Sequence, residues 1–377
     1  MRLTEAMVFD PKEGFVRRDL SIQDGKIAPE GGEEISLPGC YLIPGLTDLH
    51  FHGCVGEDFS DASAAGLQAM ADYELSRGIT QICPAGMTLG EDTLTRICEN
   101  AAAHSAKNTG GAELAGLHLE GPFLSMAKKG AQNGAFIHDP DAGMLRRLQK
   151  AANGLVKLVT LAPEQPGAEE FIRAARQEGV TVSLGHTTAD YDTASAAYKA
   201  GARQATHLFN AMPPFTHRAP GVVGAAFDSP EVKVELICDG VHIHPSVVRA
   251  VFKLFGADRV ILISDSLRAT GMPDGRYPFG GQEIEVHGNR ATMAGDPNTL
   301  AGSVSDLMAC LKTAVSFGIP LADAVTAAAV NPAKVLGIYD RLGSLDVGKQ
   351  ANVAVLDERL DLKAVLFHGE LVSGSLS

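Results

Sequence analysis

Two histidines separated by one residue are the first sign of chemistry in this chain. His50 and His52 lie within residues 46–53, directly after a Pro-Gly pair. In an extended strand, residues i and i+2 face the same side, so both imidazoles would project into one space. Two neutral imidazoles that converge in this way can share a metal ion. The pair alone does not distinguish a metal site from a strand end with half-buried histidines.

Other side chains that bind metals or carry protons follow further apolar runs. They are Glu120, His186, His207, Asp239, His242 and Asp265. With the first two histidines they provide nitrogen and oxygen ligands suited to zinc, iron or another first-row divalent ion. Six separate runs that end in such residues indicate one shared site rather than isolated polar side chains.

These ligand types allow one or two ions. One set consists of Glu120, His186 and His207. It would leave a coordination position open for water. A second set would use His50 and His52, with Asp265 nearby and Glu120 as a bridge.

A divalent ion in either position favours hydrolysis. It lowers the pKa of bound water toward about 7 and polarises a carbonyl oxygen. Asp265 is the candidate to take a proton from water and deliver it to a leaving amine. His242 is the candidate to hydrogen-bond the carbonyl oxygen as negative charge develops there.

The elements that must position these residues are short apolar runs alternating with Ala-rich segments of helical period. The runs cover residues 46–50, 80–83, 115–119, 156–161, 180–184, 204–207, 232–237 and 260–263. Helices are expected over residues 62–77, 91–107, 139–152, 168–178, 189–200, 304–317 and 321–330, with another opening at 331. Eight strands that alternate with helices predict an α/β fold, a (β/α)8 TIM-like barrel. Such a barrel carries its chemistry at the carboxyl ends of its strands, where the candidate residues lie.

The two ends of the chain lack the alternating strand and helix pattern of the central region and are instead typical of short strands joined by tight Gly and Asp turns. We expect residues 1–44 and 340–377 to form together a small β-sandwich domain. Residues 45–339 would then form the barrel.

The composition is that of an ordinary globular protein, with 45% hydrophobic and 20% charged residues among 377. A formal net charge of −13 argues against nucleic acid or an anionic membrane as partner. No apolar run is long enough to span a bilayer, and from the first residues we expect no secretory segment. The six scattered cysteines are typical of reduced thiols, so a cytoplasmic protein is expected.

The chain resembles the amidohydrolase superfamily and, within it, the N-acetylglucosamine-6-phosphate deacetylase family. The resemblance rests on residues 44–53 (PGLTDLHFHG), 116–123 (GLHLEGPF), 129–131 (KGA), 183–187 (SLGHT), 206–212 (THLFNAM), 239–242 (DGVH), 299–303 (TLAGS) and 343–357 (GSLDVGKQANVAVLD). It spans nearly the whole chain. A His-x-His pair is common to many amidohydrolases, whereas HLEGP together with THLFNAM is specific to this family.

The resemblance implies roles for particular residues. Glu120, His186 and His207 would hold the main metal, Asp265 would act as general base and acid, and His242 would contact the substrate. The residues implied in sugar binding are Ala131, Asn210, Ala211, Arg218, His242, Leu300, Ala301 and Gly302. In family dimers the arginine comes from the neighbouring subunit, so a homodimer is expected. An arginine suits a phosphate because it offers planar, bidentate donors.

Two positions bear on how closely this chain follows the family pattern. Gln132 stands where family members often have histidine, which puts a sugar contact of that side chain in doubt. The pair His50 and His52 is intact, whereas some members lack it and work with one metal. This chain therefore has room for two ions.

The resemblance implies a metal-dependent deacetylase that converts N-acetyl-D-glucosamine 6-phosphate to D-glucosamine 6-phosphate and acetate in amino-sugar catabolism. One alternative is the same hydrolysis of N-acetylgalactosamine 6-phosphate or another acylamide, since no motif visibly distinguishes the epimers. The other is a non-catalytic barrel that binds a phosphosugar. Neither the metal, zinc or iron, nor the number of ions follows from the ligand types.

Overall fold

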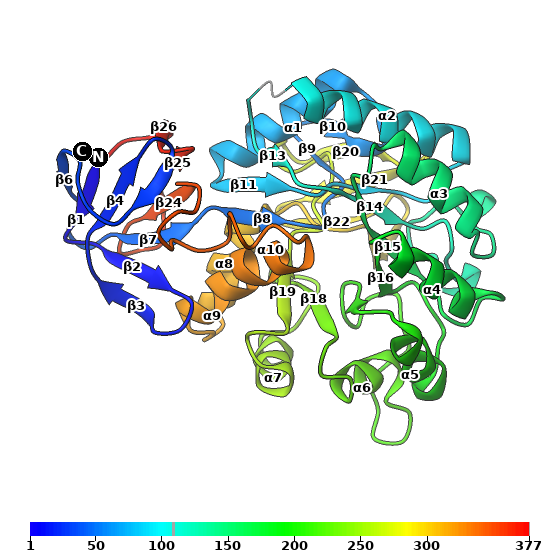
Figure 1. Cartoon of the computed structure of the whole chain (residues 1–377). Helices are drawn as coiled ribbons and strands as arrows, with labels where there is room; N and C mark the ends of the chain where they lie inside the picture. The colour runs from blue at the N-terminus through cyan, green and yellow to red at the C-terminus, as the bar shows by residue number, and fades with distance from the viewer. Residues whose placement is uncertain (108–109, 377) are drawn as a thin grey trace.

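A barrel of parallel strands surrounded by helices dominates the fold, and a smaller β-rich unit that contains both chain ends lies at its side (Figure 1). The computed structural model describes residues 1–107 and 110–376. The arrangement confirms the predicted α/β barrel with an additional β domain.

The barrel strands occur where the apolar runs predict them. They are β8 (Leu46–Asp48), β11 (Ile79–Ile82) continued by β12 (Ala85–Gly86), β13 (Glu113–Leu114) continued by β14 (Leu117–Glu120), β15 (Val156–Leu161), β16 (Thr181–Leu184), β17 (Gln204–Ala205), β18 (Lys233–Ile237) and β19 (Val260–Ile263). Neighbouring strands pair in parallel. His50 and His207 lie just beyond their strands, although the apolar runs extend to include them.

Hydrogen bonds beyond the strand ends join β19 to β8. The amide of Asp265 donates to the carbonyl oxygen of His50 at 2.9 Å. The amide of Ser264 reaches Asp48 Oδ1 at 3.5 Å. The first and last strands of the barrel therefore bring Asp265 and His50, two predicted site residues, next to each other.

Helices cover the outside of the barrel. They are α1 (Ala64–Ser76), α2 (Glu91–Lys107), α3 (Ala142–Ala151), α4 (Ala168–Gln177), α5 (Tyr191–Ala200), α6 (Gly221–Phe227), α7 (Pro245–Phe255), α8 (Leu307–Ser316), α9 (Leu321–Val325) and α10 (Asn331–Val335). Side-chain caps begin several of them, as when Asp190 accepts the amide of Thr193 at the start of α5. The predicted helix over 321–330 is instead α9 followed by a π-helical turn, Thr326–Val330. In the described ranges no helix combines the length and apolarity needed to cross a membrane.

The small unit consists of two sheets. Their strand orders are β5-β4-β1-β6 and β26-β25-β24-β7-β2-β3. The strands are β1 (Arg2–Thr4), β2 (Met7–Asp10), β3 (Gly14–Arg17), β4 (Leu20–Gln23), β5 (Lys26–Ala28), β6 (Glu34–Ser36), β7 (Tyr41–Pro44), β24 (Val353–Leu356), β25 (Leu362–Phe367) and β26 (Glu370–Gly374). Leu3, Val8, Leu42, Val353 and Leu366 are fully buried in one apolar cluster. Because β24 pairs with β7, the two ends of the chain share one sheet.

A four-stranded antiparallel sheet follows β19, and the sequence patterns do not predict it. Its strands are β20 (Gly275–Phe279), β21 (Gln282–His287), β22 (Arg290–Met293) and β23 (Asp296–Leu300). Phe279, Ile284, Val286 and Ala291 pack with Ala301 in a separate apolar cluster. The sheet thus carries its own core. Smaller elements are β9 (Gly53–Cys54), β10 (Glu57–Asp58) and the 3-10 turns Phe59–Asp61, Met126–Lys128 and Gly134–Phe136.

Candidate active site

A cavity of about 450 Å3 opens at the carboxyl end of the barrel strands. Its size falls within the range of small-molecule sites. The predicted site residues that line it are His52, Glu120, Ala131, His186, His207, Asn210, Ala211, His242, Asp265, Leu300, Ala301 and Gly302. His50 lies beneath it and is fully buried.

Glu120 is the centre of the site because its two carboxylate oxygens face different histidines. Oε1 lies 3.1 Å from the Nε2 atoms of both His186 and His207. Oε2 lies 3.2 Å from His52 Nε2. His52 Nε2 is in turn 3.3 Å from Asp265 Oδ1. One carboxylate therefore connects the two predicted sets of ligands.

The spacing of these atoms fits metal ions. Nitrogen and oxygen ligands about 2.0–2.1 Å from a tetrahedral zinc lie about 3.3 Å apart. Within the set of Glu120, His186 and His207 the ligand atoms lie 3.1 Å apart. In the second set, His50 Nε2 lies 3.8 Å from Asp265 Oδ1. That nitrogen is buried and has no hydrogen-bond partner among the described residues, as expected of an atom reserved for a metal.

Three of the candidate ligand residues have left-handed backbones. The φ angles are 46° at His186, 29° at His207 and 49° at Asp265. Such conformations are costly for residues other than glycine and concentrate at functional sites. Here they turn each side chain from the strand end into the cavity.

Glycines in the family motifs allow close packing around the ligands. A Cβ on Gly185, directly before His186, would lie 2.6 Å from Thr206 Cβ. A Cβ on Gly121, directly after Glu120, would lie 2.1 Å from Thr88 Oγ1, and this glycine has a φ of 107°. Larger residues at either position would push the ligand-bearing strand ends apart.

The electrostatics of the site combine ionised carboxylates with basic imidazoles. Burial opposes charge on His52, but hydrogen bonds with Asp265 and Glu120 raise its pKa to about 10. Burial likewise opposes charge on Glu120, yet His50, His186 and His207 hold its pKa well below the usual range. The pKa of Asp265 is also lowered, against burial, mainly by His52. Ionised carboxylates in this position attract a cation.

His242 is held by a neighbouring carboxylate. Asp239 Oδ2 lies 2.7 Å from His242 Nδ1, and Asp239 Oδ1 accepts the backbone amides of Val241 and His242. Burial disfavours the charged form of His242, but the hydrogen bond and the charge of Asp239 raise its pKa. The ring edge that carries Nε2 is therefore free to face the cavity with a proton.

The predicted contact Arg218 lies outside the cavity, whereas Gln132, at the position that departs from the family pattern, lines it. Arg218 lies on an exposed segment between β17 and α6 and is not among the residues that line the cavity. Gln132 is buried, and its side chain donates to Glu120 Oε2 while accepting the amide of Thr88. The side chain that stands in place of the family's histidine is thus turned toward a candidate metal ligand.

Glu235 is a site residue that the sequence interpretation missed. It lies on β18, is fully buried, and its Oε2 is 2.9 Å from His50 Nδ1. The available signal was a carboxylate inside the apolar run 232–237. His118, on β14, bonds through Nε2 to Thr160 Oγ1 at 2.8 Å, and burial together with His50 lowers its pKa to about 3.

Comparison with known proteins gives consistent matches over nearly the entire chain. The model of the Amidohydrolase family matches residues 41–372. An N-acetylglucosamine-6-phosphate deacetylase of Bacillus subtilis is 38% identical, covering 96% of this chain and 93% of the relative. An N-acetylgalactosamine-6-phosphate deacetylase of Escherichia coli O157:H7 is 34% identical, covering 96% and 97%. The structure of a mutant N-acetyl-D-glucosamine-6-phosphate deacetylase from Mycobacterium smegmatis, in complex with N-acetyl-D-glucosamine 6-phosphate, has a TM-score of 0.93 at 35% identity, covering 99% of both chains.

Proposed function

This chain belongs to the amidohydrolase family, and from that premise we propose that it is a metal-dependent deacetylase of N-acetyl-D-glucosamine 6-phosphate. The reaction would yield D-glucosamine 6-phosphate and acetate, as a step of amino-sugar catabolism in the cytoplasm. The observation that carries the proposal is the meeting of Glu120, His186 and His207 with Asp265 at one cavity. Relatives that bear this activity in their names match the chain over nearly its full length.

The residues that would hold the metal fall into two sets. They are Glu120, His186 and His207 for one ion, and His50, His52 and Asp265, with Glu120 as a bridge, for the other. A divalent ion, zinc or iron, supplies water of lowered pKa and polarises the acetyl carbonyl oxygen.

The chain's own residues would move the protons. Asp265 is ionised and lines the cavity, so it can take one proton from the attacking water. His242 donates from Nε2 to the carbonyl oxygen while Nδ1 remains bonded to Asp239. When the C–N bond breaks, Asp265 returns its proton to the leaving amine, which balances the reaction.

The sugar would lie against backbone and small side chains on the opposite wall of the cavity. The proposed contacts are Ala131, Asn210, Ala211, Leu300, Ala301 and Gly302. Arg218 would bind the phosphate of the neighbouring subunit's substrate in a homodimer, which agrees with its exposure on its own subunit.

Acetate release from the purified protein tests the proposal. We expect release from N-acetylglucosamine 6-phosphate, a much lower kcat/KM without the phosphate, and loss of activity after treatment with a chelator. Elemental analysis of the same preparation gives the metal and the number of ions per chain. A metal-loaded protein that binds the sugar phosphate without releasing acetate would instead be a phosphosugar-binding protein.

N-acetylgalactosamine 6-phosphate is the second candidate substrate. The similarity to the E. coli relative of that name, at 34% identity, supports testing it. Because the two sugars differ at one hydroxyl, kcat/KM for both epimers must be compared on the same preparation. A higher value for the galactosamine epimer would replace the first proposal.

A further inference from the structure

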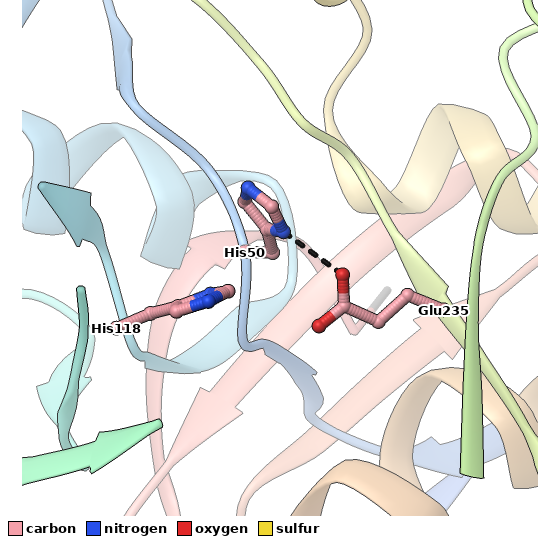
Figure 2. A group of neighbouring side chains, drawn as sticks. All are labelled: His50, His118 and Glu235. Carbon is pink, nitrogen blue, oxygen red and sulfur yellow. Dashed lines mark hydrogen bonds and ion pairs between the residues drawn. The ribbon is translucent and has the colours of Figure 1, made fainter. Parts of the chain in front are cut away.

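Glu235 makes contact with both sets of candidate metal ligands from behind. Its Oε2 lies 2.9 Å from His50 Nδ1 and accepts the backbone amide of His207 at 3.1 Å. His50 belongs to one set and His207 to the other. Figure 2 shows the carboxylate of Glu235 pointing toward the ring of His50, with His118 beside that ring. Glu235 comes from β18, which β19 separates from β8 in the barrel. A single carboxylate oxygen therefore touches a residue of each set.

The contact with Glu235 determines how His50 presents its nitrogens. A carboxylate accepts hydrogen bonds, so His50 carries a proton on Nδ1, and the lone pair of the neutral ring lies on Nε2. His118 packs against the ring at a centroid distance of 4.5 Å and an angle of 73°. The ring is thus held at its back and side, with Nε2 directed toward Glu120 and Asp265.

Glu235 is itself held in place. Gln204 on β17 donates from Nε2 to Glu235 Oε1 at 2.5 Å. Both carboxylate oxygens are therefore engaged, and Glu235 is fully buried. A carboxylate that is anchored on one side and bonded to a metal-binding imidazole on the other fixes the tautomer of that imidazole and raises its basicity as a ligand.

We propose that Glu235 is a positioning residue that makes His50 competent to bind the second metal ion. This inference rests on the proposed function, because it assumes the metal centre described above. The same carboxylate also accepts the backbone amide of His207, a residue of the first set. This contact does not involve the His207 ring, so it does not influence the tautomer or basicity of the ligand atom Nε2. We therefore expect the second ion to depend on Glu235 more strongly than the first.

The grouping of His50, His118 and Glu235 also raises the question of a third ion. The three residues lie close enough to hold one. However, Glu235 Oε2 already accepts two hydrogen bonds. His118 Nε2 is bonded to Thr160, so only its unpartnered Nδ1 could act as a ligand. An ion there would also displace the proton between His50 and Glu235. The contacts favour a supporting role over a third metal site.

The substitution Glu235→Gln removes the negative charge of this side chain but keeps its size and its hydrogen bonds. A glutamine oxygen can accept the protons of His50 Nδ1 and the His207 amide, as the carboxylate does. Its amide nitrogen can donate to Gln204 once that side chain flips, because Gln204 Oε1 has no partner among the described residues. The hydrogen bonds are kept and the negative charge is lost. Glu235→Leu removes both.

Zinc titration of the metal-depleted full-length enzyme, with a chromophoric chelator as competitor, tests the proposal. We expect Glu235→Gln to weaken the second zinc about 10-fold and Glu235→Leu about 100-fold, within the range known for residues behind metal ligands. The first zinc should change much less. Anomalous diffraction from zinc-loaded crystals assigns the lost ion to the His50 side.

The matched control is Glu74→Gln, since Glu74 is also fully buried but lies on α1 and does not line the cavity. It should bind both ions as the wild type does. Equal weakening of both ions, unchanged binding of both, or a third zinc in the wild type would overturn the proposal. Acetate release by the wild type tests the proposed function separately, because zinc binding is measured without substrate.

Discussion

At the scale of single residues, the pairing of Asp239 with His242 has a consequence for pH. Asp239 is ionised, since its bonds with His242 and two backbone amides lower its pKa against the effect of burial. The Nδ1 proton of His242 is therefore committed to Asp239. Only the doubly protonated ring then has a second proton, on Nε2, for the substrate's carbonyl oxygen.

The loss of activity at alkaline pH should therefore reflect the deprotonation of His242. Activity should fall as pH rises through the raised pKa of this ring. Asp239→Asn removes the main cause of that raised pKa, so we expect the alkaline limb of kcat/KM to move to lower pH. Measurement of kcat/KM from about pH 6 to about pH 10 gives the shift. An unmoved limb would exclude His242 as the titrating donor.

Asp265 is the residue on which proton transfer depends. Asp265→Asn should reduce kcat by about 10²–10⁴-fold or more, because general acid–base catalysis is worth that much. The first ion should remain bound, since Glu120, His186 and His207 are unchanged. Acetate release and elemental analysis of the variant measure the two effects. Substantial residual turnover would remove Asp265 from the proton-transfer role.

Gln132, which replaces the histidine usual in the family, forms its hydrogen bonds within the protein. Both polar ends of its side chain are engaged within the protein, by Glu120 and by the amide of Thr88. We expect Gln132→Ala to weaken metal binding about 10-fold or more, as for other residues behind ligands, and to change the KM for sugar less. A large rise in KM with unchanged metal affinity would instead make Gln132 a sugar contact.

At the scale of elements, the sheet β20–β23 supplies one wall of the cavity. The ring of Phe279 packs edge-on against the ring of His52, with 5.9 Å between the ring centroids. Leu300 and Ala301 line the cavity where β23 ends. Gly302 follows with a φ of 89°, and a Cβ there would lie 3.0 Å from the carbonyl oxygen of Asp265. The end of this inserted sheet is therefore packed directly against a proposed catalytic residue.

Gly302→Ala should consequently reduce activity as well as stability. The alanine has both an unfavourable backbone conformation and close contacts with Asp265 and Leu267. Gly288→Ala is the matched control, because Gly288 has a φ of 61° and no atom within 4 Å of its Cβ. The control should lose about 1–2 kcal/mol of stability and retain kcat. Urea unfolding and acetate release distinguish the two variants, and equal activity in both would contradict the argument.

At the scale of the whole molecule, the proposed homodimer would complete each site with Arg218 of the other subunit, because Arg218 lies outside the cavity of its own subunit. Arg218→Ala and Asp265→Asn enzymes should each be nearly inactive on the phosphorylated sugar. In a mixed dimer, the Arg218→Ala subunit keeps Asp265 and receives Arg218 from its partner. Random remixing should therefore restore about a quarter of the wild-type activity, since half of the dimers are mixed and each has one intact site. No restoration would mean that Arg218 does not act across a dimer.

Much of the fold and site could be predicted from the sequence because the relevant signals are local. Short apolar runs, helical periodicity and residue types at the run ends indicate barrel strands and the ligands beyond them. Glu120, His186 and His207 belong to motifs specific enough to identify as a set. The four-stranded sheet escaped prediction because its residues, such as Pro278 and Asn298, alternate weakly and its core forms only once its hairpins pair.

Residue types alone indicate which chemistry the site can support, because ligand identity is a property of the side chain. How the ligands work together depends on contacts that exist only in the folded chain. The fold bonds Gln132 to Glu120 at the wall of the cavity, and it places Glu235 of β18 behind His50 of the segment after β8. The two residues of each pair are 12 and 185 positions apart in the chain. No local pattern encodes such contacts, which arise when the barrel closes and packs its strands side by side.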